Sequence, residues 1–390
     1  MSGKYIAIFG GGPAAMAAAY FLAQNNNITI FEKENNIGQK LLVAGKGGFN
    51  LTNSLVQNEL TKKYSPRNFL DNAILEFDST SVRNWLMEIG IPTFVGTSGR
   101  VFSIKELKPI DVLNRIKNSL LEKNVKFCTN QKFTGFNNKN EPIVNGKTII
   151  IADYYIFALG GASWSLTGSD GKWVNSFNEL GIGTLPFQAS NCGVNINWPD
   201  NVKSFHEGKP LKNIRISCGE LTSKGEAVIT EYGLEGNAIY SLIPKIRELI
   251  KQNLQACIFI DFKPNNSLQQ LSAKLNESTS SKNYRKAFNL GSTEIALIKS
   301  FTKKEDYLIP SSFIKSIKSL EIKINSLRPI EEAISTVGGI DINELNSDFS
   351  LKKFPHIFTI GEMVDWDAPT GGFLLQGCFS MGHHAAKSIS

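Results

Sequence analysis

The stretch KYIAIFGGGPAAMAAAYFLAQNNNITIFE, residues 4–32, decides the fold. Its first segment, residues 4–9, is almost wholly apolar, which is typical of a buried parallel strand. After a turn of three glycines, the alanine-rich residues 13–24 predict a helix that packs closely on a sheet. Residues 28–32 predict the next strand. This order of strand, glycine turn, helix and strand predicts one βαβ unit.

The glycine turn has the spacing Gly10-x-Gly12-x-x-Ala15, and Glu32 ends the second strand 22 positions after Gly10. In this context the pattern indicates a dinucleotide site rather than a chance glycine turn. The first glycine permits the tight turn, the second lets a pyrophosphate approach the backbone, and Ala15 is small enough for contact between helix and strand. The helix start offers free N–H groups to the phosphates, and Glu32 can accept hydrogen bonds from the ribose hydroxyls.

The segment after the second strand, residues 38–53, bears on whether the nucleotide is NAD or FAD. It is rich in glycine and polar residues, and an NAD domain has no need of it. An extended FAD needs additional donors along its pyrophosphate and ribityl chain, which Lys40, Asn50, Thr52 and Asn53 could supply. An ordinary surface loop, or a dehydrogenase that uses NAD alone, is the alternative.

Length and composition restrict the protein class. The 390 residues and 42% hydrophobic content predict two or three folded domains. The net charge of +7 comes from interspersed basic and acidic residues without a long basic block, so we expect a small-molecule substrate and no nucleic acid partner. Five cysteines without a CxxC pair, and four histidines without HxxxH or HExxH, predict no disulfide framework and no metal, and they fit a reducing cytoplasm.

Residues 5–23 carry no charge and mimic a signal peptide, but the glycine turn would break a membrane helix there. We expect no membrane segment and cytoplasmic localisation. The sequence makes no prediction of the oligomeric state.

The two ends of the chain share apolar strands and helices, whereas the middle of the chain has another sequence pattern. Residues 154–159 and 357–360 are apolar strands, and residues 109–123 and 373–389 are helical. Between them, residues 191–262 alternate short strands with Gly, Pro and Asn, and residues 267–313 are polar and helical. This arrangement predicts an insertion within one α/β domain.

Three segments together resemble one family: residues 10–15 (GGGPAA), residues 38–53, and residues 361–376 (GEMVDWDAPTGGFLLQ). They are similar to bacterial FAD-dependent oxidoreductases related to aminoacetone oxidase and to a bile-acid dehydro-reductase. The resemblance implies an α/β fold with a Rossmann-like FAD-binding domain of the glutathione-reductase type, formed by residues 1–190 and 319–390. It also implies an inserted β-barrel-like domain at residues 191–265 and a small helical subdomain at residues 266–318.

Two departures from the family pattern affect phosphate binding. Gln39 and Gly48 stand where most relatives have arginine, so bidentate contacts to phosphate are missing there. Lys40 and Lys46 could replace them as point charges.

The resemblance also implies the cofactor-binding residues. The amides after Gly371 and Gly372 would face the N1–C2=O edge of the flavin, and Thr336 and Gln376 could form hydrogen bonds with the ring edge. Glu362 would contact the ribityl region. The backbone of Phe133 or Lys132 would contact the adenine. The full set is Gly10, Gly12, Pro13, Ala14, Ala15, Glu32, Lys33, Lys40, Leu41, Asn50, Thr52, Asn53, Phe133, Ala158, Gly160, Gly338, Gly361, Glu362, Gly371, Gly372, Phe373 and Gln376.

The sequence does not identify a catalytic acid or base. Trp164, Tyr232 and Arg100 are candidates to line a substrate pocket, and the pair His383-His384 is interpreted as surface or helix-end residues. No second strand–GxGxxG–helix unit is present, so NAD(P)H would serve only as a transient reductant. We expect an FAD-dependent oxidoreductase acting on a small organic molecule, an amine or an enone. A tRNA-modifying flavoprotein and a non-catalytic FAD-binding protein are the alternatives.

Overall fold

The computed structural model describes residues 3–44, 49–275 and 279–389. The chain divides into two compact units: unit 1 comprises Met1–Ala189 and Ile334–Ser390, and unit 2 comprises Ser190–Ala333. Unit 1 therefore contains both ends of the chain, with unit 2 between its two parts in the sequence.

A parallel sheet forms the centre of unit 1. Its strand order is β20 (Ile357–Thr359), β10 (Tyr154–Phe157), β1 (Tyr5–Phe9), β2 (Asn27–Phe31) and β6 (Lys126–Cys128). Ile8 in β1 lies opposite Ile30 in β2 and Ile156 in β10, and all three side chains are buried. The apolar runs of the sequence thus become strands covered on both faces, and unit 1 is an α/β fold of Rossmann type.

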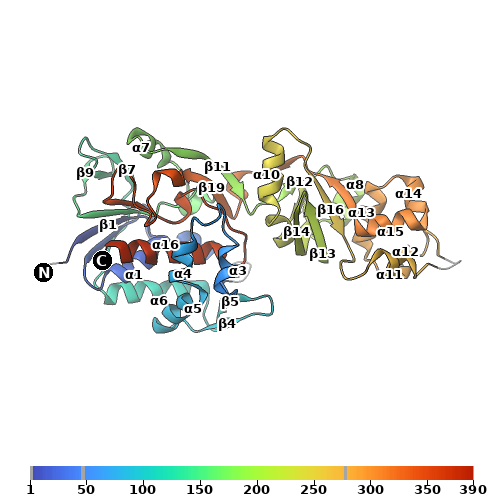
Figure 1. Cartoon of the computed structure of the whole chain (residues 1–390), viewed down its shortest axis with the longest axis horizontal. Helices are drawn as coiled ribbons and strands as arrows, with labels where there is room; N and C mark the ends of the chain where they lie inside the picture. The colour runs from blue at the N-terminus through green and yellow to red at the C-terminus, as the bar shows by residue number, and fades with distance from the viewer. Residues whose placement is uncertain (1–2, 45–48, 276–278, 390) are drawn as a thin grey trace. The chain divides into compact units, whose positions relative to one another are not determined.

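Two helices from opposite ends of the chain pack together beside this sheet. Helix α1 (Pro13–Leu22) and helix α16 (Phe373–Ile389) lie side by side in Figure 1. A Cβ atom added at Gly382 would lie 2.4 Å from the carbonyl oxygen of Ala14. Because only small residues permit this approach, the alanine-rich sequence of α1 is explained by contact between helix backbones.

Smaller elements complete unit 1. Its antiparallel strands are β3 (Asn50–Asn53), β5 (Arg100–Ser103) and β4 (Thr93–Val95) in one sheet, β7 (Phe133–Phe136), β8 (Pro142–Val144) and β9 (Thr148–Ile149) in another, and β11 (Thr184–Ser190) with β19 (Ser335–Ile340). Its further helices are α2 (Gln39–Ala44), α3 (Gln57–Thr61), α4 (Asp71–Glu76), α5 (Ser79–Glu88), α6 (Pro109–Glu122) and α7 (Val174–Glu179).

Unit 2 combines an antiparallel sheet with a set of helices. The sheet order is β17 (Leu320–Lys323), β16 (Cys257–Asp261), β13 (Pro210–Cys218), β14 (Leu221–Ile229), β15 (Gly233–Glu235), β12 (Val194–Asn195) and β18 (Ser326–Leu327). Its helices are α8 (Asp200–His206), α9 (Asn237–Tyr240), α10 (Ile243–Lys251), α11 (Leu268–Ser272), α12 (Tyr284–Ala287), α13 (Ser292–Phe301), α14 (Lys304–Leu308) and α15 (Pro310–Lys318).

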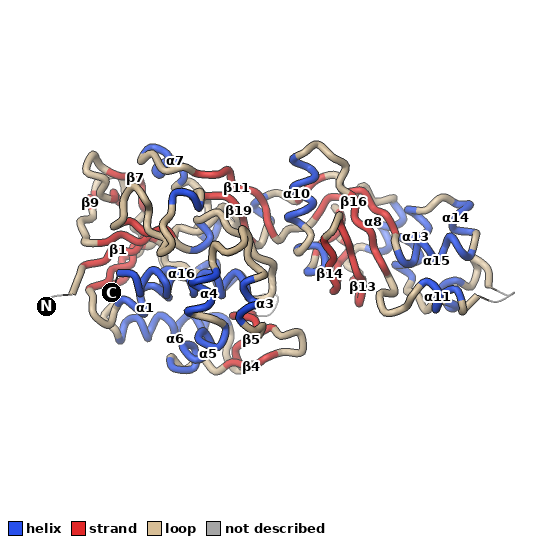
Figure 2. The backbone as a smooth tube through the Cα atoms, in the orientation of Figure 1, coloured by secondary structure: helices blue, strands red, loops and turns tan. Residues whose placement is uncertain are grey.

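Helices α11–α15 gather at one end of this sheet (Figure 2). An aromatic group holds α12, α14 and α15 together: the ring of Tyr284 stacks on Phe313 at 3.9 Å and meets Tyr307 edge-on at 5.8 Å. Lys318 ties the end of α15 to the sheet, since its ammonium group donates to Asp261 at 2.6 Å and to two backbone carbonyls.

Candidate functional site

The glycine turn between β1 and α1 requires glycine at its first position. Gly10 has φ +95°, and an added Cβ atom would lie 2.4 Å from the carbonyl oxygen of Ala158 at the end of β10. The Gly10 amide donates to the carbonyl oxygen of Phe31 at 2.8 Å, which fixes the turn at the carboxyl ends of the strands. In open parallel sheets this edge is where ligands bind.

The first turn of α1 has no side-chain cap. Gly12 occupies the N-cap position, and no atom of the described residues lies within 4 Å of the place where its Cβ would be. The amides of Ala14 and Ala15 have no intrahelical partner by helix geometry. The open space above them fits the pyrophosphate that the sequence predicts.

Glu32 lies against this turn. Its Oε2 accepts a hydrogen bond from the Gly11 amide at 2.6 Å, and its Oε1 accepts one from the Glu34 amide at 2.9 Å. Burial raises the pKa of Glu32 above its ordinary value, and these two bonds oppose that rise. The carboxylate is thus held rigidly beside the loop, with further acceptor positions on each oxygen. The neighbouring Lys33 is engaged elsewhere, in an ion pair with Asp170 at 2.9 Å.

A charged network links α2 to the C-terminal part of the chain. The ammonium group of Lys40 donates to Glu362 Oε2 at 2.6 Å and to Ser163 Oγ at 2.9 Å. Glu362 Oε1 accepts from the Thr336 amide at 2.9 Å. The structure thus brings the predicted residues Lys40, Glu362 and Thr336 together. It adds Ser163, which has no recognisable sequence signal because a lone serine after a glycine pair is common.

The segment before α16 approaches β3 very closely. Gly372 has φ +93°, and an added Cβ atom would lie 2.3 Å from the Thr52 carbonyl oxygen. The side-chain amide of Asn53 donates to the Gly371 carbonyl at 3.1 Å. By helix geometry, the first amides of α16, beginning at Phe373, have no intrahelical partner. The predicted residues of β3 and α16 are therefore adjacent.

Polar side chains beneath this turn are buried, and most of them are satisfied. Gln376 is fully buried; its Oε1 accepts from Thr52 Oγ1 at 2.5 Å, and its Nε2 donates to the Phe77 carbonyl and to Ser380 Oγ. Both ends of the Gln376 amide are thus engaged inside the protein. By contrast, Asn50 Oδ1 is buried and has no hydrogen-bond partner among the described residues.

The remaining predicted glycines lie where backbones meet. An added Cβ at Gly338 would lie 2.5 Å from the Pro186 carbonyl, and at Gly361 one would lie 3.0 Å from Ala14 Cβ. Gly160 has φ +76°, and its carbonyl accepts from the indole of Trp173 at 3.0 Å. These glycines have packing reasons for their presence, independent of any ligand.

Other predicted residues also take part in the packing of unit 1. Phe133 is buried among the rings of Phe9, Phe136 and Phe157. Leu41 on α2 belongs to the same hydrophobic core. Lys46 and Gly48 lie outside the described residues.

The three pocket candidates come from both units: Trp164 and Arg100 belong to unit 1, and Tyr232 belongs to unit 2. Trp164 is half-buried in unit 1 in the left-handed conformation (φ 61°, ψ 56°), which is rare for a large side chain. Arg100 on β5 is half-buried in unit 1, and its guanidinium makes no ion pair or hydrogen bond with the described residues. Its Nε would lie 3.9 Å from a Cβ added at Gly371, so it flanks the start of α16.

Tyr232 belongs to unit 2. Its hydroxyl donates to Glu235 Oε2 at 2.6 Å, and the guanidinium of Arg328 lies 3.9 Å from its ring centre. Burial, followed by the bond to Glu235, raises the pKa of Tyr232 well above its ordinary value. The phenol therefore keeps its proton at neutral pH.

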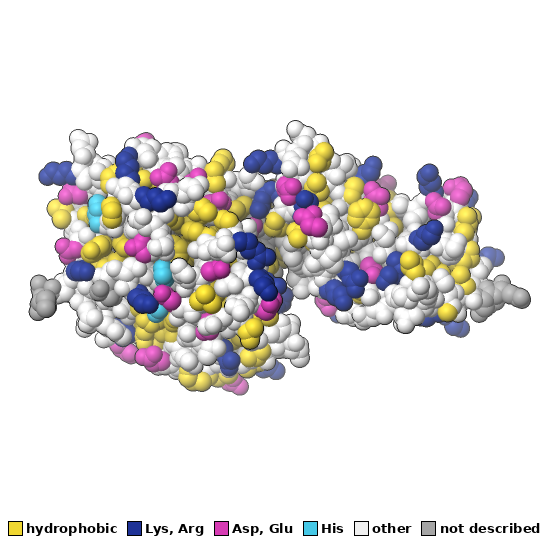
Figure 3. All heavy atoms as spheres, in the orientation of Figure 1, with side chains coloured by type: hydrophobic (Ala, Val, Ile, Leu, Met, Phe, Trp, Pro, Cys, Tyr) yellow, Lys and Arg dark blue, Asp and Glu magenta, His cyan; other side chains and the backbone are white. Residues whose placement is uncertain are grey.

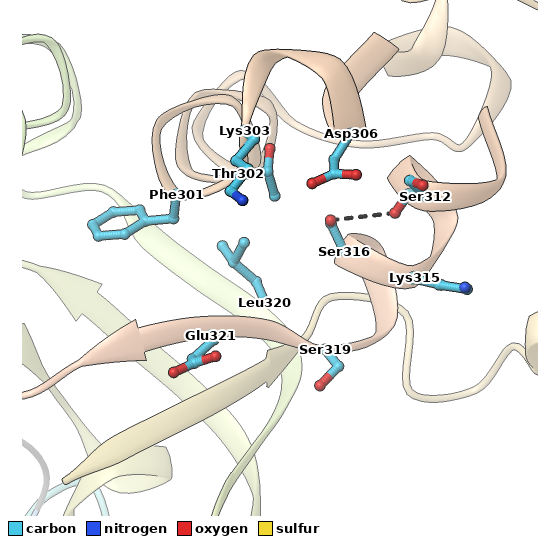
Figure 4. Close-up of a pocket in the computed structure, with 10 residues that line it drawn as sticks. All are labelled: Phe301, Thr302, Lys303, Asp306, Ser312, Lys315, Ser316, Ser319, Leu320 and Glu321. Atoms are coloured by element: carbon cyan, nitrogen blue, oxygen red, sulfur yellow. Dashed lines mark hydrogen bonds between the residues drawn. The ribbon is translucent and has the colours of Figure 1, made fainter. Parts of the chain in front are cut away.

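A hollow of about 410 Å³ lies among α13, α14, α15 and β17, and contains none of these residues. Figure 4 shows hydroxyl groups of Ser312, Ser316 and Ser319 around it, together with Asp306 and Glu321. Within the described ranges, no group of three His, Cys, Asp or Glu side chains is suited to a metal ion. The described helices include none that is long and apolar enough to cross a membrane.

The model of the family described as "HI0933-like protein Rossmann domain" matches residues 4–388. The chain belongs to this family. The Clostridium scindens protein named 3-dehydro-bile acid delta(4,6)-reductase is 22% identical and covers 99% of the chain and 98% of its own length. This relative confirms the family that the sequence resembles.

Two further similarities complete the comparison. The Escherichia coli protein named ribosomal RNA dihydrouridine synthase is 21% identical, over 98% of this chain and 97% of its own length. The crystal structure of 3-ketosteroid-delta4-(5alpha)-dehydrogenase from Rhodococcus jostii, in complex with 4-androstene-3,17-dione, has a TM-score of 0.51 at 12% identity. The superposition covers 99% of this chain and 97% of the dehydrogenase chain. At this low identity the similarity shows the fold alone.

Proposed function

We propose that this chain is an FAD-dependent oxidoreductase that transfers a hydride between the flavin and an organic substrate. The observation that carries the proposal is the uncapped start of α1 at the carboxyl edge of a parallel sheet, with the Glu32 carboxylate bonded to the Gly11 amide. This arrangement offers amides to a diphosphate and an acceptor to a ribose.

Features farther along the chain favour FAD over NAD alone. The start of α16, flanked by the half-buried Arg100, would lie at the N1–C2=O edge of the flavin, where reduction places negative charge. Lys40 would bind the region between diphosphate and ring, as would Asn50 Oδ1, which has no partner in the described part of the chain. The cofactor supplies the hydride chemistry, and these side chains bind and orient it.

The substrate that we propose contains a carbon–carbon double bond conjugated to a carbonyl group. The names of two relatives that match nearly the whole chain describe reductions of this kind, one in a 3-dehydro bile acid and one in uridine. Saturation of such a bond needs a hydride at one carbon and a proton at the other. We propose NAD(P)H as the transient source of reducing equivalents.

Anaerobic mixing with NADH, NADPH and candidate substrates, while the flavin absorbance is followed, tests this function. We expect one donor to bleach the flavin and a conjugated enone to restore its colour in the absence of oxygen. An amine that bleaches the flavin, with no reoxidation by any enone, would replace the reductase with an amine oxidase. A flavin that no donor reduces would favour a non-catalytic FAD-binding protein.

A second candidate function is reduction of a base within an RNA. Two relatives named ribosomal RNA dihydrouridine synthase match 98% of the chain each. We also propose that residues 191–265 form a barrel-like domain and that residues 266–318 form a small helical subdomain, whichever of the two substrates the protein uses.

A further inference from the structure

A loop of unit 1 leaves the carboxyl end of β10 and returns close to where it began. The indole N–H of Trp173 donates to the Gly160 carbonyl at 3.0 Å, and a Cβ atom added at Gly160 would lie 2.7 Å from Ser169 Oγ. The two ends of the loop are therefore close together, as in an Ω-loop, and loops of this kind are frequently functional. We call residues 163–170, which lie within this loop, the strap.

The strap is attached on both sides of the glycine turn. At its start, Ser163 Oγ accepts from Lys40, whose ammonium group also bonds Glu362, a residue that follows β20. At its end, Asp170 forms an ion pair at 2.9 Å with Lys33, a residue that follows β2. In the sheet order β20, β10, β1 and β2, the glycine turn follows β1 and thus lies between these attachments. The strap therefore spans the carboxyl edge of the sheet at the predicted diphosphate site.

The middle of the strap is exposed and keeps its own shape. Residues Ser165–Thr167 form a short 3₁₀ turn with no buried residue, and Leu166 is 96% exposed. The amide and the hydroxyl of Thr167 both donate to the Trp164 carbonyl. Trp164 has φ 61°, a conformation that is costly for a large side chain and is found mainly at functional sites. A segment that is attached at its ends and exposed between them can lift as a unit.

We infer that the strap closes over the diphosphate of FAD and that the ion pair between Lys33 and Asp170 is the latch that controls release of the cofactor. The inference rests on the proposed function, which places the diphosphate at the glycine turn. A dinucleotide that extends from Glu32 toward Glu362 then passes between the turn and the strap. The latch side chains are 23% and 20% exposed, so the pair is shielded enough to hold the strap and accessible enough to open.

Charge reversal at the latch tests this inference in the FAD-loaded protein. Lys33→Asp and Asp170→Lys each replace the attraction by a repulsion, and the double exchange restores an ion pair of opposite polarity. The measurement is the rate at which bound radiolabelled FAD is released into an excess of unlabelled FAD. We expect each single variant to release FAD about fivefold faster, and the double exchange to regain most of the wild-type rate. Asp170→Asn, which removes the attraction without a repulsion, should give a smaller increase.

The direction of the two single effects separates a latch from simple attraction between the protein and the cofactor. Because FAD is an anion, a general charge effect would make release faster in Lys33→Asp and slower in Asp170→Lys. A latch makes release faster in both. Charged side chains of both signs are dispersed over the visible face in Figure 3, and Lys62 forms an exposed ion pair with Glu59 at 2.6 Å in unit 1. Lys62→Glu is the matched control, and it should leave the rate unchanged.

Three results would overturn this inference: slower release from Asp170→Lys, unchanged rates in both single variants, or a double exchange that releases FAD as fast as the single variants. In each of these cases the wild-type chain still binds FAD, so the proposed function stands without the latch. A wild-type chain that retains no labelled FAD would refute the proposed function and the latch together.

Discussion

Replacement of Glu32 by alanine should weaken FAD binding by a factor that the structure allows us to estimate. Each Glu32 oxygen already accepts one backbone amide, from Gly11 and from Glu34, which leaves one acceptor position on each for a ribose hydroxyl. A hydrogen bond to a charged acceptor contributes about 1.5–3 kcal/mol. Loss of two such bonds therefore costs roughly 3–6 kcal/mol, or about 10²- to 10⁴-fold in Kd.

Fluorescence titration of the apo-protein with FAD measures this change. Glu32→Gln retains one acceptor oxygen without the charge, so we expect an intermediate Kd. Glu122→Ala is the matched control, because Glu122 is an exposed carboxylate on α6 with no role in the proposed site. Circular dichroism of each variant separates weaker binding from loss of the fold.

The pH dependence of binding provides a second readout for Glu32. Burial raises the pKa of this carboxyl group, so the carboxylate is lost at a higher pH than for an exposed glutamate. FAD affinity should fall as the pH falls through this raised pKa, and Glu32→Gln should flatten the profile. An unchanged Kd in Glu32→Ala, with the fold intact, would show that Glu32 does not contact the ribose.

The other predictions concern three further positions. Gly372→Ala should lower Tm more than the control Gly146→Ala. Both glycines have a positive φ, but only at Gly372 would the added Cβ lie 2.3 Å from a carbonyl oxygen. Equal losses of Tm would contradict this close approach. Arg100→Gln should lower the midpoint potential of bound flavin by on the order of 30 mV, measured spectroelectrochemically, while Arg100→Lys retains it; no shift would place Arg100 away from the ring. His383 has a pKa lowered by burial, so its stabilisation is complete above pH about 6.5 and is lost as the pH falls through the lowered value. Thermal unfolding of His383→Phe should show a smaller loss of stability on acidification than the wild type, and identical profiles would refute this.

The sequence predicts the centre of unit 1 well because its signals are local. The strand, glycine turn and helix of residues 4–32 are each set by neighbouring residues, and β1, α1 and β2 lie within two residues of the expected bounds. By contrast, α2 is not predicted as a helix, since its short sequence after Gly38 has little periodicity.

Contacts between distant segments could not be predicted. Lys40 and Glu362 are 322 positions apart, and nothing in either segment indicates that they form an ion pair. The sequence interprets His383 as a surface or helix-end residue, but its ring is half-buried and stacks on Phe77 at 4.5 Å, and its Nδ1 is buried without a partner among the described residues. The binding of the flavin edge by Gln376 stays a prediction, and the amide is engaged by buried groups.

Titration of the purified apo-protein with FAD tests the central claim most directly. We predict saturable binding of one FAD per chain, with the structured flavin spectrum of an enclosed ring, and weaker binding in Glu32→Ala. A chain that is correctly folded by circular dichroism, yet leaves the FAD spectrum and fluorescence unchanged at every protein concentration, would contradict the account.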